Sequence, residues 1–194
     1  MPRPIHHTAP EKTARTLVVL GSGGHTAEML ALLKHLDMDK LRPRTYVIAS
    51  TDSMGAQKAL AAEKAFSASK DEALDHANIV AIPRSREVGQ SYLTSIWTTL
   101  VAAWAAMAIV WREAPELVLV NGPGTCIPLC FAAHLFRLFR WGTRIVYVES
   151  IARVESLSLS GKVLYHMRMA DAFVVQWPHL QQRFPRSMYR GSLY

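Results

Sequence analysis

The chain has 194 residues, of which half are hydrophobic and 19% are charged. This composition predicts one folded domain with a substantial core and excludes an intrinsically disordered chain. Lys and Arg number 22 against 15 Asp and Glu, and the net charge of +7 favours an anionic partner. The basic residues are neither clustered nor interleaved with aromatic residues, so phospholipid headgroups or a phosphorylated substrate are favoured over nucleic acid.

The first segment, Met1–Arg15, is polar and contains three prolines, which predicts a flexible lead without a secretory signal or a membrane anchor. The two cysteines, Cys126 and Cys130, are spaced to share one helix face. Because no second Cys or His pair accompanies them, we expect neither a zinc site nor a disulfide framework, and no metal or cofactor is predicted. A reducing, cytosol-facing environment is the simplest interpretation.

The first predicted unit is a strand, a glycine turn and a helix. The run Thr16–Leu20 is typical of a buried strand, and apolar residues then recur at helical spacing to about Leu36. Gly21-Ser-Gly-Gly-His-Thr-Ala-Glu28 lies between them. Its glycines let a ligand approach the backbone, and the free N–H groups of the helix start favour a phosphate. The turn lacks the third glycine of a dinucleotide fingerprint and the Gly-Lys-Ser/Thr of a Walker A loop.

Two acidic motifs near this unit have ordinary explanations. Asp37-Met-Asp39 has the D-x-D form of some metal sites, but it lies past the helix, away from the ligand end of the sheet, so a solvated turn is favoured. Asp52 follows the second predicted strand, at 45–49. Its carboxylate is placed either to cap the next helix or to hold a ribose, and the cap is favoured.

Further strands are predicted at 78–82, 116–120, 144–148 and 172–175, and helices at 57–68, 126–139 and 163–169. Between 91 and 111 runs an uncharged stretch with Trp97, Trp104 and Trp111 seven residues apart, hence on one helix face. Its length approaches that of a transmembrane helix, but a span would split the sheet across the bilayer. A helix in the membrane surface and a buried crossover helix stay open, and the basic flanks favour membrane contact.

Alternating strands and helices predict an α/β fold with a doubly wound, Rossmann-like parallel sheet. In such a sheet the first and fourth strands are neighbours at the switch point. Each is followed by a glycine turn, the second being Asn121-Gly-Pro-Gly-Thr125. We therefore expect the two turns to face one another across one crevice, flanked by the Arg84 and Glu149 loops.

Five motifs occur in the order found in one known family. They are Gly21-Ser-Gly-Gly-His-Thr-Ala-Glu28, Pro83-Arg-Ser-Arg-Glu-Val88, Asn121-Gly-Pro-Gly-Thr-Cys126, Val148-Glu-Ser-Ile-Ala-Arg-Val154, and Ser160-Gly-Lys162 through Gln176-Trp-Pro178. With them the chain, from about Leu17 to Tyr194, resembles the membrane-anchoring, acceptor-side subunits of the eukaryotic two-subunit UDP-N-acetylglucosamine transferase. It is similar, more distantly, to the amino-terminal half of the bacterial MurG transferase.

The resemblance implies the amino-terminal half of a GT-B glycosyltransferase. Such a subunit would bind GlcNAc-PP-dolichol at the cytosolic face of the endoplasmic reticulum membrane. It would also recruit a small, donor-binding catalytic subunit that brings UDP-GlcNAc, giving the second GlcNAc of the N-glycan precursor. A chain of 194 residues supplies one Rossmann-like half, so we expect it to be inactive alone. Family members usually begin with a transmembrane helix, which Met1–Arg15 does not match; either the sequence is shortened, or the 91–111 helix alone supplies membrane contact.

The expected site follows from the turns and the resemblance together. His25 is the candidate general base on the acceptor hydroxyl, because imidazole accepts protons near neutral pH, and Glu28 either orients His25 or caps the helix. Trp97, Trp104 and Trp111 are expected to contact the membrane, and a tail at 177–194, through Leu193 and Tyr194, to dock the partner. The residues expected at the acceptor diphosphate are Gly23, Gly24, Thr26, Arg84, Arg86, Gly122, Gly124, Thr125, Glu149 and Arg153.

Other interpretations of the same residues stay open, and they would change the expected function. His25 as a hydrogen-bonded core or capping histidine would leave no base, and Arg84 and Arg86 as surface partners of Glu87 would leave less charge for a diphosphate. The chain would then be a membrane recruiter with no catalytic residues of its own. A nucleotide-dependent oxidoreductase is a third possibility, disfavoured by the missing third glycine and the lack of a substrate domain.

Overall fold

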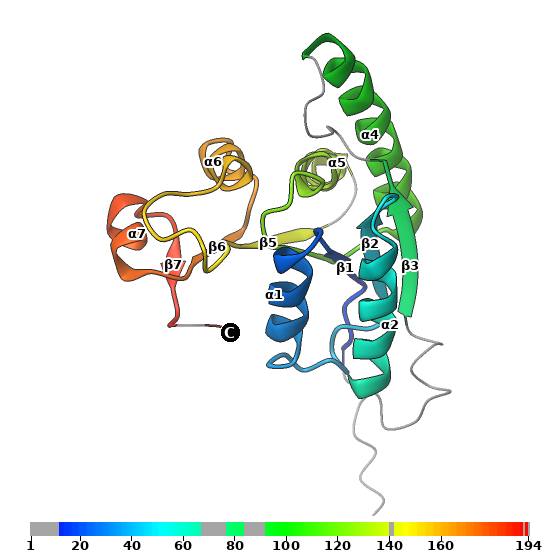
Figure 1. The fold of residues 1–194 in the computed structure, drawn as a ribbon, viewed down its shortest axis with the longest axis horizontal. Helices are drawn as coiled ribbons and strands as arrows, with labels where there is room; N and C mark the ends of the chain where they lie inside the picture. The colour runs from blue at the N-terminus through cyan, green and yellow to red at the C-terminus, as the bar shows by residue number, and fades with distance from the viewer. Residues whose placement is uncertain (1–11, 67–76, 84–91, 140–141, 192, 194) are drawn as a thin grey trace, which may run out of the picture.

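The computed structural model describes residues 12–66, 77–83, 92–139, 142–191 and 193. In this part of the chain, seven parallel strands form one sheet in the order β3-β2-β1-β4-β5-β6-β7 (Figure 1). The strands are β1 (Thr16–Val19), β2 (Arg44–Ala49), β3 (Ala77–Ile82), β4 (Leu117–Val120), β5 (Arg144–Val148), β6 (Ala172–Val175) and β7 (Met188–Tyr189). The helices are α1 (Gly24–Leu33), α2 (Ser53–Phe66), α4 (Tyr92–Glu113), α5 (Cys126–Phe139), α6 (Leu159–His166) and α7 (Pro178–Arg183).

The predicted fold class, a doubly wound Rossmann-like sheet, is confirmed. Strand β1 pairs in parallel with both β2 and β4, so the order reverses at β1 as expected. Alternate residues of β1 enter different cores: Leu17 packs among residues of α4, α5 and α6, and Val18 among residues of α1 and α2. The sheet is thus covered on both faces, which explains why its central strands are continuous apolar runs.

The last part of the chain holds two elements that the sequence analysis did not predict, α7 and β7. Strand β7 pairs with β6 through only two residues, and α7 has six, so neither gives a periodic pattern long enough to detect. Phe184, Tyr189 and Leu193 are half-buried against the two cores instead of standing exposed. Docking of a partner by the tail stays a prediction, and Tyr194 lies outside the described residues.

Helix α4 has one buried and one exposed apolar face. Ala102, Ala106 and Val110 are buried, whereas Trp97 and Trp104 are 69% and 80% exposed. Trp111 is also exposed, on the same side, with its ring 5.4 Å from that of Phe136 in α5. The helix is therefore not buried all round, and its first turns project beyond the sheet in Figure 1. None of the helices in the described ranges has the length and hydropathy needed to cross a membrane.

The structure confirms the favoured interpretations of Asp52 and of the Asp37–Asp39 motif. Asp52 Oδ1 accepts a hydrogen bond from Gly55 N at 3.0 Å, so it caps α2. The Asp37–Asp39 segment is an exposed turn in which Asp37 pairs with Lys40 at 3.1 Å. The cysteines share one face of α5 and are both buried with free thiols.

A buried ion pair joins β2 to α2. Arg44 Nε lies 2.6 Å from Glu63 Oε1, and both side chains are almost fully buried. Arg44 also donates to the carbonyls of Met38 and Leu41, and Tyr46 donates its hydroxyl to Glu63. Both charges are thereby hydrogen-bonded, a condition for burying an ion pair without a large penalty. Residue types and spacing gave no sign of this pair, because its partners lie on different elements.

We expect Glu63→Ala to lower the free energy of unfolding by about 3–5 kcal/mol, because it leaves the Arg44 guanidinium buried without a counter-charge. Urea unfolding monitored by circular dichroism would measure the loss. Glu116→Ala is the matched control: its pair with Arg15 is half-exposed, with atoms 3.8 Å apart, so the expected loss is below about 1 kcal/mol. Equal losses for the two variants would contradict this account.

Candidate active site

Two glycine turns meet at the carboxyl ends of β1 and β4. A Cβ atom built on Gly21 would lie 2.7 Å from the Cβ atoms of both His25 and Pro123, so only glycine allows the two turns to pack this closely. Gly122, in the second turn, has a φ of +98°, and a Cβ there would lie 3.7 Å from His25 Cε1. The predicted juxtaposition of the turns is confirmed, with the His25 ring between them.

The backbone around the start of α1 is open. Gly23 has a φ of +63°, which favours glycine, and it stands at the N-cap position. Cβ atoms added on Gly23, Gly24 and Gly124 would meet no atom of another element within 4 Å among the residues that the structure describes. At Gly24 and Gly124, where φ is not positive, internal packing does not explain the missing side chain. The N–H groups of α1 thus begin at an uncovered surface, where a helix dipole favours an anion.

His25 and Glu28 form a pair on the first turns of α1. His25 Nδ1 lies 3.7 Å from Glu28 Oε2, with the histidine side chain 35% exposed and the glutamate 16%. The His25 carbonyl accepts a hydrogen bond from Asn121 Nδ2 at 2.6 Å, and Ser150 Oγ donates to Glu28 Oε1 at 2.7 Å. Residues from the ends of β4 and β5 therefore hold this helix turn in place.

Several buried polar atoms in the crevice have no hydrogen-bond partner among the described residues. They are His25 Nδ1, Glu28 Oε2, Asn121 Oδ1 and Thr125 Oγ1. Such atoms are uncommon in folded proteins, where buried polar groups are nearly always paired. Their gathering at one place indicates a site prepared for a polar ligand.

Glu149 lies beneath the crevice and is fully buried. Its Oε1 accepts from Tyr147 Oη and Ser150 N, both at 3.1 Å, and its Oε2 accepts from Ser158 N at 3.0 Å and Ser158 Oγ at 3.2 Å. Burial raises the pKa of the Glu149 carboxyl above its ordinary value of 4.5, although these donors oppose the rise. Both its carboxylate oxygens accept hydrogen bonds inside the protein, so in this structure Glu149 supports the crevice from beneath.

The other predicted diphosphate residues divide into four groups. Gly23, Gly24, Gly122, Gly124 and Thr125 belong to the two turns. Thr26, by contrast, is buried and donates its hydroxyl to the Gly21 carbonyl, so it stabilises the turn from within. Arg153 is exposed in the loop after β5. Arg84 and Arg86 lie outside the described residues.

Three residues of the site were missed: Asn121, Tyr147 and Ser150. Asn121 and Ser150 each follow the end of a strand beside the switch point, where parallel sheets place ligands. This position could have identified both residues as part of the site, since each is adjacent in the sequence to a residue that was predicted there. Tyr147 gave none, because a strand tyrosine is typical of a core.

Helix α7 fixes the loop at 150–158 from the opposite side. Trp177 Nε1 donates to the Ile151 carbonyl at 2.9 Å, and Arg183 donates to the Glu155 carbonyl at 3.1 Å. His179 Nε2 also contacts the Val154 carbonyl. The loop therefore makes hydrogen bonds on two sides: to Trp177 and α7 on one side, and to Glu28 on the other.

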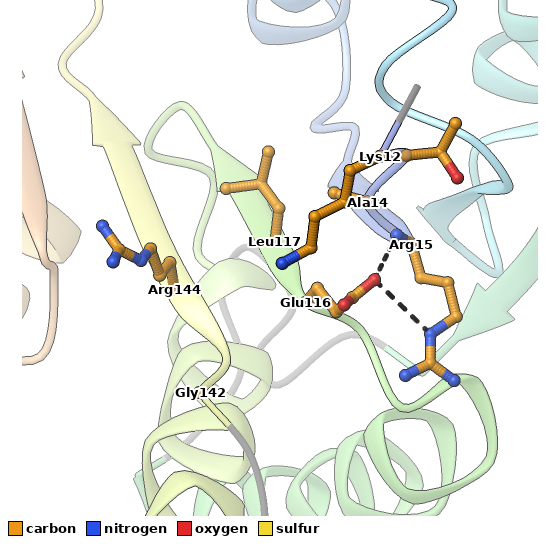
Figure 2. A pocket seen from close by; sticks show the side chains of 8 residues that line it. Lys12, Ala14, Arg15, Glu116, Leu117, Gly142 and Arg144 are labelled. Carbon is orange, nitrogen blue, oxygen red and sulfur yellow. Dashed lines mark hydrogen bonds and ion pairs between the residues drawn. The ribbon is translucent and has the colours of Figure 1, made fainter. Parts of the chain in front are cut away.

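A cavity of about 490 Å³ lies at the opposite end of the sheet (Figure 2). It is lined by Lys12, Arg15, Glu116 and Arg144, with Arg15 N donating to Glu116 Oε2 at 3.0 Å. Ligands of open parallel sheets bind outside the carboxyl ends of the strands, and this cavity is at their amino ends. It is therefore not the site prepared by the glycine turns.

We expect Glu149→Gln to change how stability depends on pH. Because the folded-state pKa of Glu149 is raised, this group favours folding most at low pH, and its contribution falls as pH rises from about 4.5 through the folded-state pKa. The free energy of unfolding of the wild type, minus that of the variant, should therefore decrease over this interval, as measured by urea unfolding. A difference for Glu149 that rises with pH would contradict the assignment.

Similar proteins are consistent with this geometry. Solved structures with a similar fold include MurG of Acinetobacter baumannii, with a TM-score of 0.59 at 16% identity, over 91% of this chain and 43% of that one. Another is a UDP-N-acetylglucosamine 2-epimerase, with a TM-score of 0.54 at 17% identity, over 86% of this chain and 42% of that one. These likenesses establish a Rossmann-like fold, and the chain covers less than half of each of these two structures.

A second set of proteins has a much higher sequence identity to this chain than these solved structures have. Proteins named "UDP-N-acetylglucosamine transferase subunit ALG14" are 46% identical in mouse, over 97% of this chain and 87% of that protein, and 42% identical in Yarrowia lipolytica, over 92% and 81%. The human protein of that name is 46% identical over 95% of this chain and 85% of its own length. The family described as "Oligosaccharide biosynthesis protein Alg14 like" matches residues 16–193. The chain belongs to the Alg14 family.

Proposed function

We propose that the chain is the acceptor-binding subunit of a UDP-GlcNAc transferase that adds the second GlcNAc to GlcNAc-PP-dolichol. The observation that carries this proposal is the group of unpaired polar atoms on His25, Glu28, Asn121 and Thr125, gathered where the two glycine turns meet. Relatives named as subunits of a UDP-N-acetylglucosamine transferase support the reaction class.

In this proposal His25 is the general base. Its Nδ1 is directed at Glu28 Oε2, which favours the tautomer with hydrogen on Nδ1 and leaves Nε2 to accept a proton. The acceptor hydroxyl oxygen attacks the anomeric carbon of UDP-GlcNAc, the bond from that carbon to the UDP oxygen breaks, and the hydroxyl proton passes to His25. The 3.7 Å separation exceeds a hydrogen bond, a looseness common in sites without substrate.

The acceptor diphosphate is proposed to lie against the uncovered turns. Backbone N–H groups near Gly24 and Gly124, together with the dipole of α1, favour its negative charge. Arg153, exposed in the loop after β5, is proposed to add a positive charge, and Arg84 and Arg86 are assigned the same role from the sequence alone. Glu149 and Thr26, assigned to this group from the sequence, are instead placed in its support.

The donor site is proposed to lie on a separate small subunit. GT-B enzymes bind their two substrates between two Rossmann-like halves, and the described residues form one sheet and hence one half. We propose that this chain recruits that subunit to the cytosolic face of the endoplasmic reticulum membrane, with Leu193 and Tyr194 in the docking segment. Neither subunit then transfers sugar without the other.

Membrane contact is proposed for the exposed face of α4. Trp97, Trp104 and Trp111 stand on it beside Leu100, which is also exposed. Tryptophan favours the interface between headgroups and acyl chains, and large apolar side chains exposed together on one helix face are typical of a contact surface. With this face in the membrane surface, the subunit would lie close to its lipid-linked acceptor, which is held in the same bilayer.

We expect sugar transfer from UDP-GlcNAc to a short-chain lipid-diphospho-GlcNAc only when this chain and its donor-binding partner are combined. In the complex, His25→Ala should reduce kcat by roughly 100-fold or more, because it removes the general base. Its binding to the partner, measured by co-purification, should be unchanged. Radiolabelled product formation measures transfer.

The outcomes separate the candidate functions. Transfer by this chain alone would overturn the two-subunit proposal, and wild-type turnover by His25→Ala would overturn the base. A chain that recruits the partner to membranes while variants in Gly23–His25 keep full activity would be a recruiter without catalytic residues. That alternative is favoured only by the exposed tryptophan face.

We expect the double variant Trp97→Ala, Trp104→Ala to lower binding to vesicles of phosphatidylcholine and phosphatidylinositol by at least about tenfold, because each ring buries a large apolar area in the interface. Co-sedimentation measures the effect. Met54→Ala, on α2, is the control, since it removes an apolar side chain that is 63% exposed elsewhere. Equal binding by the double variant and the wild type would contradict membrane contact through α4.

A further inference from the structure

Ser150 connects the loop after β5 to the first turns of α1. Its Oγ lies 2.7 Å from Glu28 Oε1, although the two residues are 122 positions apart in sequence. Ser150 is buried, with 4% of its surface exposed. The contact is therefore a tertiary one inside the crevice and not an exchangeable surface hydrogen bond.

The direction of this hydrogen bond is fixed. An ionised carboxylate only accepts, so the Ser150 hydroxyl must donate its single hydrogen to Glu28. The same oxygen accepts from Ala152 N at 3.3 Å, which sets its lone pair toward the loop backbone. As a result the two oxygens of Glu28 differ: Oε1 is occupied by Ser150, whereas Oε2 is unpaired and faces His25 Nδ1.

Ser150 itself is held rigidly. Its N–H donates to Glu149 Oε1 at 3.1 Å, and Glu149 is fixed in turn by the donors of Ser158 and Tyr147. On the other side, Trp177 Nε1 holds the carbonyl of the next residue, Ile151. A hydroxyl anchored on both sides can fix the rotamer of a longer, more flexible glutamate.

We infer that Ser150 is a positioning residue: it fixes Glu28 so that the free carboxylate oxygen aligns the His25 imidazole for proton transfer. This inference rests on the proposed role of His25 as the base. Ser150 does not contact the acceptor, so it acts on turnover through Glu28 and not on binding of the acceptor. Misaligned catalytic groups lose rate steeply even when the substrate still binds.

A double-mutant cycle in the two-subunit complex tests this. Ser150→Ala should lower kcat by roughly 10- to 100-fold, the equivalent of one hydrogen bond to a charged group, and leave the KM for the lipid acceptor within about twofold. Ser150→Thr, which keeps the hydroxyl, should recover most of the activity. In a Glu28→Ala background, Ser150→Ala should have no further effect on single-turnover product formation, because the side chain through which it acts is gone.

Thr143→Val is the matched control. Thr143 is also buried, and its Oγ1 donates to the Pro115 carbonyl at 2.8 Å, at the amino end of β5 and away from the crevice. It should leave kcat unchanged, with melting temperatures compared for every variant. Wild-type kcat for Ser150→Ala, no recovery with threonine, or an undiminished effect in the Glu28→Ala background would each overturn the inference. If His25→Ala is inactive while Ser150→Ala is normal, only this inference fails; if His25→Ala is active, the proposed base fails first.

Discussion

The parallel pairing of β1 with β4 is the constraint on which the site depends. It brings together two turns separated by about a hundred residues of sequence, and Gly21 packs on Pro123 with no room for a side chain. The start of α1, with His25 and Glu28, is held in this position by Asn121. A slip in the register of β1 against β4 would move the histidine away from the residues that hold it, so the core that fixes the register also fixes the chemistry.

A second layer of constraint comes from β5. The Glu149 carboxylate accepts hydrogen bonds from Tyr147, Ser150 and Ser158, and a Cβ atom on Gly161 would collide with it. Burying a carboxylate is unfavourable unless donors surround it, and the surrounding donors shape the loop that reaches Glu28. Among the described residues, the fully buried charged side chains are Glu149, beneath the place where the polar ligand is proposed to bind, and the Arg44–Glu63 pair between β2 and α2.

Features of the fold and the site could be predicted from the sequence mainly where the residues that determine them lie close together in the chain. Strands such as Arg144–Val148 and Ala172–Val175 were predicted with their observed bounds, because each is a short apolar run between turn signals. The meeting of the turns followed from the strand order alone. The contact of Ser150 with Glu28 and the pair of Arg44 with Glu63 had no local signal, since both depend on side chains from distant elements. The burial of Glu149 and Thr26 was not predicted either, because the spacing of residues carries no information on burial at a strand end.

The way α7 holds the loop after β5 has a consequence for sequence variation. Trp177, His179 and Arg183 all contact backbone carbonyls, at Ile151, Val154 and Glu155, and none of these contacts uses a loop side chain. The shape of the loop is therefore independent of the identity of most of its residues. Exposed side chains such as Ile151 and Val154 can therefore be replaced without loss of the contacts that hold the loop backbone.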